Sequence, residues 1–243
     1  MSLALPLTHL KAGKRNLARL ITYLENGQAP RTILSALDAA RKKSLLIGIT
    51  GAAGAGKSTL SAHLIQHLRR PRQKIAFIGC DPSSPYSGGA FLGDRVRLGA
   101  LRDENLFVRS MATRGAPGGI ARATPAACGA LALAGYNPII IESVGAGQLD
   151  VAIKRWVDLA VVVLAPDHAD SIQLAKAGLL EIADLFVLNK MDHPHSRRAE
   201  QNLKSHLSLN RNTIEIPVFR TVATRGSGVR ELARWIQDRF DSQ

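Results

Sequence analysis

The stretch Gly51-Ala52-Ala53-Gly54-Ala55-Gly56-Lys57-Ser58 is rich in glycine and ends in a lysine and a serine. It follows an apolar run at 44–49 and precedes a helical pattern with leucine at positions 60, 64 and 68. Strand, glycine-rich turn and helix in this order are the context of a phosphate-binding P-loop. Backbone N–H groups of such a loop surround phosphate oxygens, Lys57 supplies positive charge, and the Ser58 hydroxyl can ligate Mg²⁺. We therefore predict that this stretch, with Thr59, binds the phosphates of a nucleoside triphosphate.

Apolar runs alternate with helical patterns along the rest of the chain. The predicted strands are Leu45–Ile49, Ile75–Cys80, Leu106–Arg109, Ile139–Glu142, Leu159–Leu164, Leu185–Leu188 and Val218–Val222. Helices are predicted between them, including Ser171–Ile182 and Val229–Phe240. Several strands are continuous Val/Ile/Leu runs, as expected for strands buried on both faces. The pattern predicts an α/β fold with a mostly parallel, doubly wound sheet, helices on both faces, and ligands at the carboxyl ends of the strands.

Residues 1–43 precede the first predicted strand. Four apolar residues share one helical face, Asn26-Gly27 ends that helix, and Pro30 suits the start of a second one; the apolar residues are Leu17, Leu20, Ile21 and Leu24. We expect a small helical appendage at 1–43 packed on a P-loop domain at 44–243. An ordinary helix pair and a regulatory element both fit this pattern.

Composition restricts the partners and the compartment. The 243 residues carry 32 Lys and Arg against 19 Asp and Glu, a net charge of +13. Basic residues form no run of five and are not interleaved with aromatics, so nucleic-acid binding is not favoured. Cys80 and Cys128 form no CxxC motif, which favours a reducing compartment without structural zinc. The apolar start at 1–10 lacks the charge and length of a signal peptide or membrane span, so we expect a cytoplasmic protein without a membrane partner.

Carboxylates follow two of the predicted strands. Asp81 comes directly after the second strand, where it could reach Mg²⁺ or, alternatively, cap a helix. Glu142 closes the fourth strand, the arrangement in which a carboxylate orients Mg²⁺ or its waters. Three residues later, Gly145 offers an unhindered N–H to a γ-phosphate. These positions predict a metal shell beside the P-loop.

The motif Asn189-Lys190-Met191-Asp192 follows the sixth predicted strand and indicates the base. The Asp192 carboxylate can accept hydrogen bonds from N1–H and the exocyclic amine of guanine, whereas adenine offers no such pair of donors. Lys190 can lie over the base, and Asn189 can join this loop to the P-loop. Ala223, after the last strand, is expected to offer its N–H to the guanine oxygen.

Longer stretches make the chain resemble one family, the MeaB/ArgK family of P-loop GTPases, which includes the methylmalonic aciduria type A protein. The resemblance is carried by Asp81-Pro82-Ser83-Ser84-Pro85, Gly88-Gly89, Leu92-Gly93-Asp94-Arg95-Val96-Arg97, Arg109-Ser110-Met111, Thr113-Arg114-Gly115, 118–124 and 142–148. It implies a GTPase, with GTP or GDP and Mg²⁺ as ligands and with Ser58, Asp81, Asp94 and Glu142 in the metal shell. It further implies a chaperone for cofactor loading or protection of an adenosylcobalamin-dependent acyl-CoA mutase.

The resemblance also implies an output loop at 166–178, where Asp170, Gln173 and Lys176 match the family pattern. The family typically has Gly-Ala-Gly-Asp-Glu-Leu-Gln where 167–173 has Asp-His-Ala-Asp-Ser-Ile-Gln, and Val222 replaces its usual serine. Family members generally continue beyond the last helix into an arm that builds a homodimer, whereas this sequence ends at Gln243. The homodimer is therefore left open.

Catalysis is assigned to Lys57, which stabilises charge on the phosphates, and to Gln148, a candidate for positioning the attacking water. Gln148 can equally be an ordinary polar loop residue, so we expect slow hydrolysis until a partner completes the site. Two other functions are considered. A nickel-insertion GTPase needs a Cys/His site, and the scattered histidines do not form one, apart from the pair His193 and His195. A kinase or transport-linked ATPase is the other, and Asp192 argues against it because it favours guanine.

Overall fold

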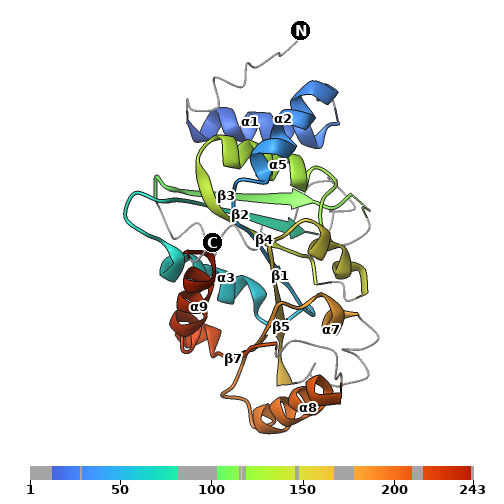
Figure 1. Cartoon of the computed structure of the whole chain (residues 1–243), viewed down its shortest axis with the longest axis vertical. Coiled ribbons are helices and arrows are strands. Elements are labelled where there is room, and N and C mark those ends of the chain that lie inside the picture. Colours follow the sequence, from blue (N-terminus) through green and yellow to red (C-terminus); the bar gives the residue numbers. More distant parts are fainter. Residues whose placement is uncertain are drawn as a thin grey trace.

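The computed structural model of the chain describes residues 13–27, 29–81, 103–114, 116, 119–145, 148–166, 178–209 and 216–241. Within these residues, seven strands form one sheet in the order β3-β2-β4-β1-β5-β6-β7, and every neighbouring pair is parallel (Figure 1). The strands are β1 (Leu46–Thr50), β2 (Lys74–Asp81), β3 (Leu106–Ala112), β4 (Tyr136–Glu142), β5 (Leu159–Leu164), β6 (Leu185–Leu188) and β7 (Val218–Arg220). The predicted fold class is confirmed.

Helices cover both faces of this sheet. They are α1 (Lys14–Glu25), α2 (Arg31–Arg41), α3 (Lys57–Leu68), α5 (Thr124–Leu133), α7 (Leu179–Ile182), α8 (Ser196–Leu209) and α9 (Val229–Asp241), with 3₁₀ turns η2 (Gln148–Arg155) and η4 (Ala223–Arg225). Residues 171–177 of the predicted helix Ser171–Ile182 lie outside the described residues. None of the helices in the described part of the chain combines the length and apolar character that a membrane crossing requires.

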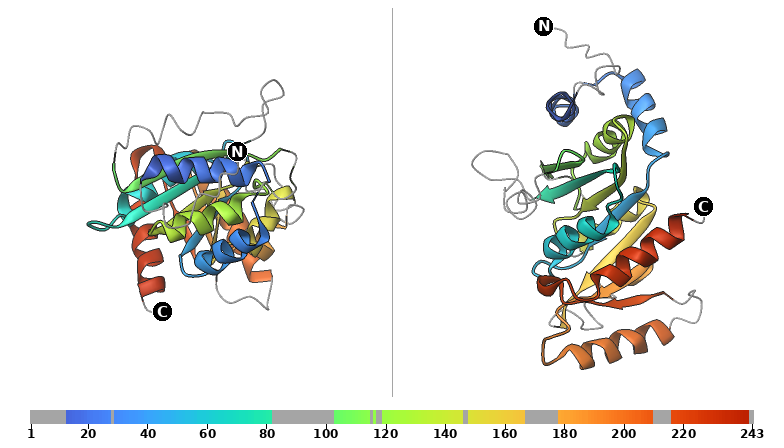
Figure 2. Two further views of the ribbon diagram at one scale, coloured as in Figure 1. Left: turned by 90° about the horizontal axis from the view of Figure 1, so that it is seen from above. Right: turned by 90° about the vertical axis from the view of Figure 1, so that its left-hand side faces the viewer.

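Successive side chains of each strand point to opposite faces of the sheet, so the hydrophobic core has two parts, one on each face. In β4, Ile139 and Ile141 join the core beneath α1, α2 and α5, whereas Ile140 joins the core beneath α3 and α9. The right-hand view of Figure 2 shows α3 and α9 together on one side of the sheet and α5 on the other. Because both faces are covered, the central strands β1, β5 and β6 are buried along their whole length.

One strand is shorter than predicted. The sequence predicts a last strand over Val218–Val222, but β7 ends at Arg220. Val222 instead bonds back to Ser227, donating its N–H to the Ser227 carbonyl over 3.0 Å. This tight loop packs η4 against α3, with Gly226 beside the His63 ring.

The two N-terminal helices pack directly on the sheet layer. A Cβ on Gly129 of α5 would lie 2.2 Å from the Leu37 carbonyl oxygen, so the glycine lets α2 approach the α5 backbone closely. Arg109 of β3 donates to the Ala18 carbonyl over 3.2 Å and forms an ion pair with Glu25, which holds α1 along the edge strand. The apolar face of α1 belongs to the same core as α5. The domain boundary at residue 43 stays a prediction.

Candidate functional site

The glycine-rich loop connects β1 to α3 at the carboxyl edge of the sheet. Gly51 has φ 140°, and a Cβ there would lie 2.1 Å from the Val163 carbonyl oxygen, so another side chain would collide with the backbone of β5. At the other end of the loop, α3 begins at Lys57 with Gly56 in the left-handed region. The first N–H groups of a helix have no partner within it and attract anions, so α3 directs a phosphate-binding terminus at this loop.

Lys57 is the cation of this loop and is nearly buried, with 7% of its surface exposed. Its ammonium donates to the carbonyl oxygens of Gly51 and Ala52 over 2.9 and 3.1 Å. The loop after β4 is joined to the P-loop beside Lys57: the Ala53 N–H donates to the Gly145 carbonyl over 3.1 Å. Gly145 has φ 83°, and a Cβ there would lie 2.8 Å from the Gly51 carbonyl oxygen and 2.3 Å from the Lys57 nitrogen, so this close approach requires glycine.

Oxygen atoms suited to Mg²⁺ lie at the ends of β2 and β4 and at the start of α3. Ser58 donates from its hydroxyl to Oε1 of Glu142 over 2.6 Å, and the carboxylate is buried at the end of β4. Asp81 is also buried and ends the neighbouring strand β2, whose Gly79 lies opposite Glu142. Mg²⁺ is bound by one or two carboxylates together with substrate phosphates and water, not by a cage of protein ligands. The residues therefore fit Mg²⁺, and among the described residues no group of three His, Cys, Asp or Glu forms such a cage.

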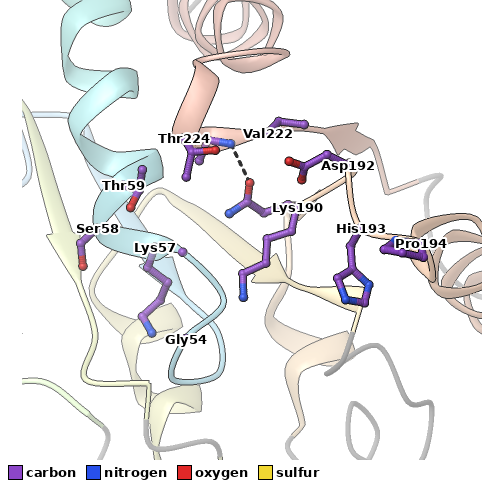
Figure 3. Close-up of a pocket in the computed structure, with 13 residues that line it drawn as sticks. Gly54, Lys57, Ser58, Thr59, Lys190, Asp192, His193, Pro194, Val222 and Thr224 are labelled. Carbon is purple, nitrogen blue, oxygen red and sulfur yellow. Dashed lines mark hydrogen bonds between the residues drawn. The ribbon is translucent and has the colours of Figure 1, made fainter.

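A cavity of 680 Å³ extends from the glycine-rich loop to the loop after β6. Its lining comes from three segments far apart in the sequence: the P-loop and first turn of α3, residues 189–194, and residues 222–224 (Figure 3). Lys190 and Asp192 line it, and the Asp192 carboxylate turns toward the segment that carries Val222 and Thr224 (Figure 3). The volume and the polar lining suit a nucleotide.

Asn189 joins these segments and is almost fully buried. Its side-chain NH₂ group donates to the Ala55 carbonyl over 2.9 Å. Its oxygen accepts from the Thr221 hydroxyl over 3.0 Å and from the Ala223 N–H over 2.9 Å. The three loops are thus held in one arrangement by a single amide. In this arrangement the Ala223 N–H is bonded to Asn189.

Several predicted site residues come together here, although their roles stay predictions. Predicted site residues that line the cavity are Gly54, Gly56, Lys57, Ser58, Thr59, Asn189, Lys190, Asp192 and Ala223. Gly51 and Ala52 bond to Lys57, Ala55 bonds to Asn189, and Ala53 bonds to Gly145. Glu142 bonds to Ser58 of the cavity lining, and Asp81 ends β2, the strand that pairs with β4. Asp94, the side chain of Gln148, and residues 167–177 of the output loop lie outside the described residues.

Sequence reasoning missed Ser61 and Arg225. Ser61 is fully buried, and its hydroxyl lies 2.8 Å from Oε2 of Glu142. A serine among the inward positions of α3 was a signal that this face meets a polar group. Arg225 lies 4.0 Å from the Asp192 carboxylate, but both side chains are substantially exposed, so this pair contributes little.

Comparison with known proteins identifies relatives of the whole site-bearing region. A sequence model of the family described as methylmalonyl Co-A mutase-associated GTPase MeaB matches residues 17–242. A putative GTPase of Pyrococcus horikoshii, PH0274, is 40% identical over 94% of this chain and 74% of its own length.

Two further similarities have different coverage. The fused isobutyryl-CoA mutase of Cupriavidus metallidurans is 39% identical over 90% of this chain, which corresponds to 21% of that larger protein. The crystal structure of a protein named LAO/AO transport system kinase has a TM-score of 0.67 and 28% identity, covering 96% of this chain and 72% of that one. The relatives thus share the region that builds the sheet and the cavity.

Proposed function

The chain belongs to the MeaB family of GTPases, and we propose that it hydrolyses GTP to GDP and phosphate as a chaperone of an adenosylcobalamin-dependent acyl-CoA mutase. The observation that carries the enzymatic part is the single cavity that joins Lys57 to Asp192. One end of this cavity presents a cation and helix N–H groups to phosphates. The other end presents a carboxylate to two adjacent N–H donors, which guanine has and adenine lacks.

In this proposal the chain's own residues position the triphosphate and stabilise its charge. Lys57 exchanges the carbonyl oxygens of Gly51 and Ala52 for phosphate oxygens, so its ammonium is held near its place of action before the nucleotide arrives. Water attacks the γ-phosphorus in line, and the bond to the β–γ bridging oxygen breaks as GDP leaves. Ser58, with Asp81, Asp94 and Glu142 in the metal shell, would hold Mg²⁺, which would supply positive charge to the phosphates.

Gln148 is our candidate for orienting the attacking water, from the start of η2. Until a partner completes the site, we expect slow turnover. A purified sample that completes many turnovers per second alone would contradict this part of the proposal.

The chaperone role is supported by relatives in which a region like this chain is fused to isobutyryl-CoA mutase. We propose that the loop at 166–178, with Asp170, Gln173 and Lys176, transmits the nucleotide state to the mutase. Cys80 and Cys128 are buried and form no disulfide, which supports a reducing, cytoplasmic setting.

Two experiments test the proposal. Calorimetry should give a much higher affinity for GDP than for ADP, and equal affinities would overturn the GTPase assignment. Affinity purification with the GTP-loaded and GDP-loaded protein should recover a mutase subunit in a nucleotide-dependent way. Recovery of nucleic acid alone would contradict the mutase partner and direct attention to the charge of +13.

A kinase or transport-linked ATPase is the second candidate, because a solved structure with 28% identity carries the name LAO/AO transport system kinase. The same GDP and ADP measurement separates it from a GTPase. A nickel-insertion GTPase is less well supported, since no Cys/His cluster occurs among the described residues. Stoichiometric nickel in a dialysed sample would restore that hypothesis.

A further inference from the structure

Ser61 lies one helical turn after Ser58, on the side of α3 that faces the sheet. Its side chain is fully buried, whereas that of Ser58 borders the cavity. The Ser61 hydroxyl lies 2.8 Å from Oε2 of Glu142 and 2.9 Å from the carbonyl oxygen of Lys57. Residues three apart on a helix are neighbours on its surface, so α3 presents two hydroxyl groups to the same carboxylate.

The proton of Ser61 has a preferred acceptor. A hydroxyl has only one proton to donate, and the Lys57 carbonyl, four residues before Ser61, is the acceptor of the Ser61 N–H in a regular helix. A carboxylate is the stronger acceptor, and Glu142 is only 3% exposed. A buried carboxylate is strongly destabilised unless its oxygens receive hydrogen bonds. The Ser61 hydroxyl therefore donates to Glu142.

The two serines divide the carboxylate between them. Ser58 donates to Oε1 over 2.6 Å and Ser61 donates to Oε2 over 2.8 Å. The last torsion of a glutamate side chain has a broad energy minimum, so a single bond would leave the plane of the carboxylate poorly defined. With both oxygens held, the plane is defined. Ser58 can then continue to donate its hydrogen bond to Glu142, while a lone pair on the Ser58 oxygen remains for a cation.

We propose that Ser61 is a positioning residue for the Mg²⁺ site: it holds the Glu142 carboxylate in the orientation that the metal shell requires. This inference rests on the proposed function, because it assumes that Glu142 serves a nucleotide-bound Mg²⁺. Ser61 is not one of the residues that line the cavity, and its described contact with Lys57 is to the backbone carbonyl oxygen and not to Nζ. It acts through Glu142.

The test is the Mg²⁺ dependence of GDP binding to nucleotide-free protein, measured by calorimetry from EDTA to saturating Mg²⁺. For Ser61→Ala we expect GDP affinity in EDTA to equal that of the wild type. The Mg²⁺ concentration that produces half of the rise in affinity should increase about 10-fold, as when groups that orient metal ligands are removed. A purely structural role would not separate these two quantities.

Three further variants control the result. Ser61→Cys keeps the shape of the side chain with a much weaker donor and should reproduce the shift, even if Ser61→Ala folds poorly. Ser61→Thr keeps the hydroxyl and should restore the wild-type Mg²⁺ dependence. Ser35→Ala removes an exposed helical serine whose hydroxyl bonds the Arg31 carbonyl over 3.1 Å, and it should change nothing.

The outcomes distinguish this inference from the proposed function. If the wild type binds GDP with a clear Mg²⁺ effect that Ser61→Ala and Ser61→Cys retain unchanged, the positioning role is wrong and the GTPase proposal stands. If Ser61→Ala lost GDP affinity equally in EDTA and in Mg²⁺, Ser61 would have only a structural role, and the positioning role would again be wrong. If the wild type does not prefer GDP over ADP, the proposed function itself fails, and the inference fails with it.

Discussion

The side-chain amide of Asn189 donates to the carbonyl oxygen of Ala55, 2.9 Å away, and so ties the loop after β6 to the P-loop after β1. The same side chain accepts from Thr221 and from the Ala223 N–H. The two ends of the cavity, which we propose bind the phosphates and the base, are therefore linked through one buried residue. Their spacing is set before a nucleotide enters.

Replacing Asn189 with alanine should loosen this link. The change leaves the Ala55 carbonyl and the Ala223 N–H without their partner, and we expect the free energy of unfolding to fall by about 2–4 kcal/mol. GDP affinity should fall as well, because the two ends of the cavity are no longer held at a fixed separation. Urea unfolding and calorimetry measure the two effects. Wild-type stability in this variant would show that the link does not hold the loops together.

Asp192→Asn should change the preferred base. The carboxamide replaces one acceptor oxygen with a donor, so guanine loses a charge-assisted hydrogen bond and meets donor against donor. We expect GDP affinity to fall about 100-fold. The ring of xanthosine diphosphate offers a carbonyl oxygen in place of the exocyclic amine. This nucleotide should therefore bind the variant more tightly than it binds the wild type. Unchanged discrimination between the two nucleotides would remove Asp192 from base recognition.

Gly129→Ala should separate α2 from α5. The added methyl group would lie 2.2 Å from the Leu37 carbonyl oxygen, a backbone atom that cannot move aside without shifting α2. Overpacking of this kind costs about 1–3 kcal/mol in the free energy of unfolding. Ser35→Ala, an exposed change on α2, should stay within about 0.5 kcal/mol. If both variants match the wild type in urea unfolding, the close approach of the two helices is wrong.

Burial of Cys80 should make stability depend on pH in the alkaline range. Burial raises the pKa of this thiol from 9.0 to about 11, and burial also raises the pKa of Cys128. A pKa that is raised in the folded state gives stabilisation that is complete below the unfolded pKa and is lost as the pH rises through the folded one. Between pH 9 and 11, Cys80 should therefore contribute a loss of about 2–3 kcal/mol.

The measurement compares urea unfolding of the wild type and of Cys80→Ala across this pH range. Other groups titrate there too, so the difference between the two proteins isolates Cys80. The variant should show the shallower decline. Parallel curves would mean that the thiol ionises as readily in the folded protein as in the unfolded one.

The strands and the P-loop were predictable because their signals are local. A buried parallel strand is a short apolar run, and β1, β5 and β6 lie within one residue of their predicted bounds. The end of β7 was not predictable from its apolar run, because the return of Val222 to Ser227 is a turn that this run does not encode. The metal role of Asp94 and the output loop at 166–178 remain predictions.

The sequence by itself determined the fold class and the glycine-rich loop between β1 and α3, since each depends on residue types at close spacing after a strand; on the same basis it predicts that Asp192 binds the base. Only the tertiary structure decided that Ser61 reaches Glu142, 81 residues away, and that Asn189 reaches Ala55, 134 residues away. Such contacts depend on the register of parallel strands and on how helices dock against them. Both are properties of the packed sheet and cannot be predicted from any short stretch of sequence, the P-loop region included.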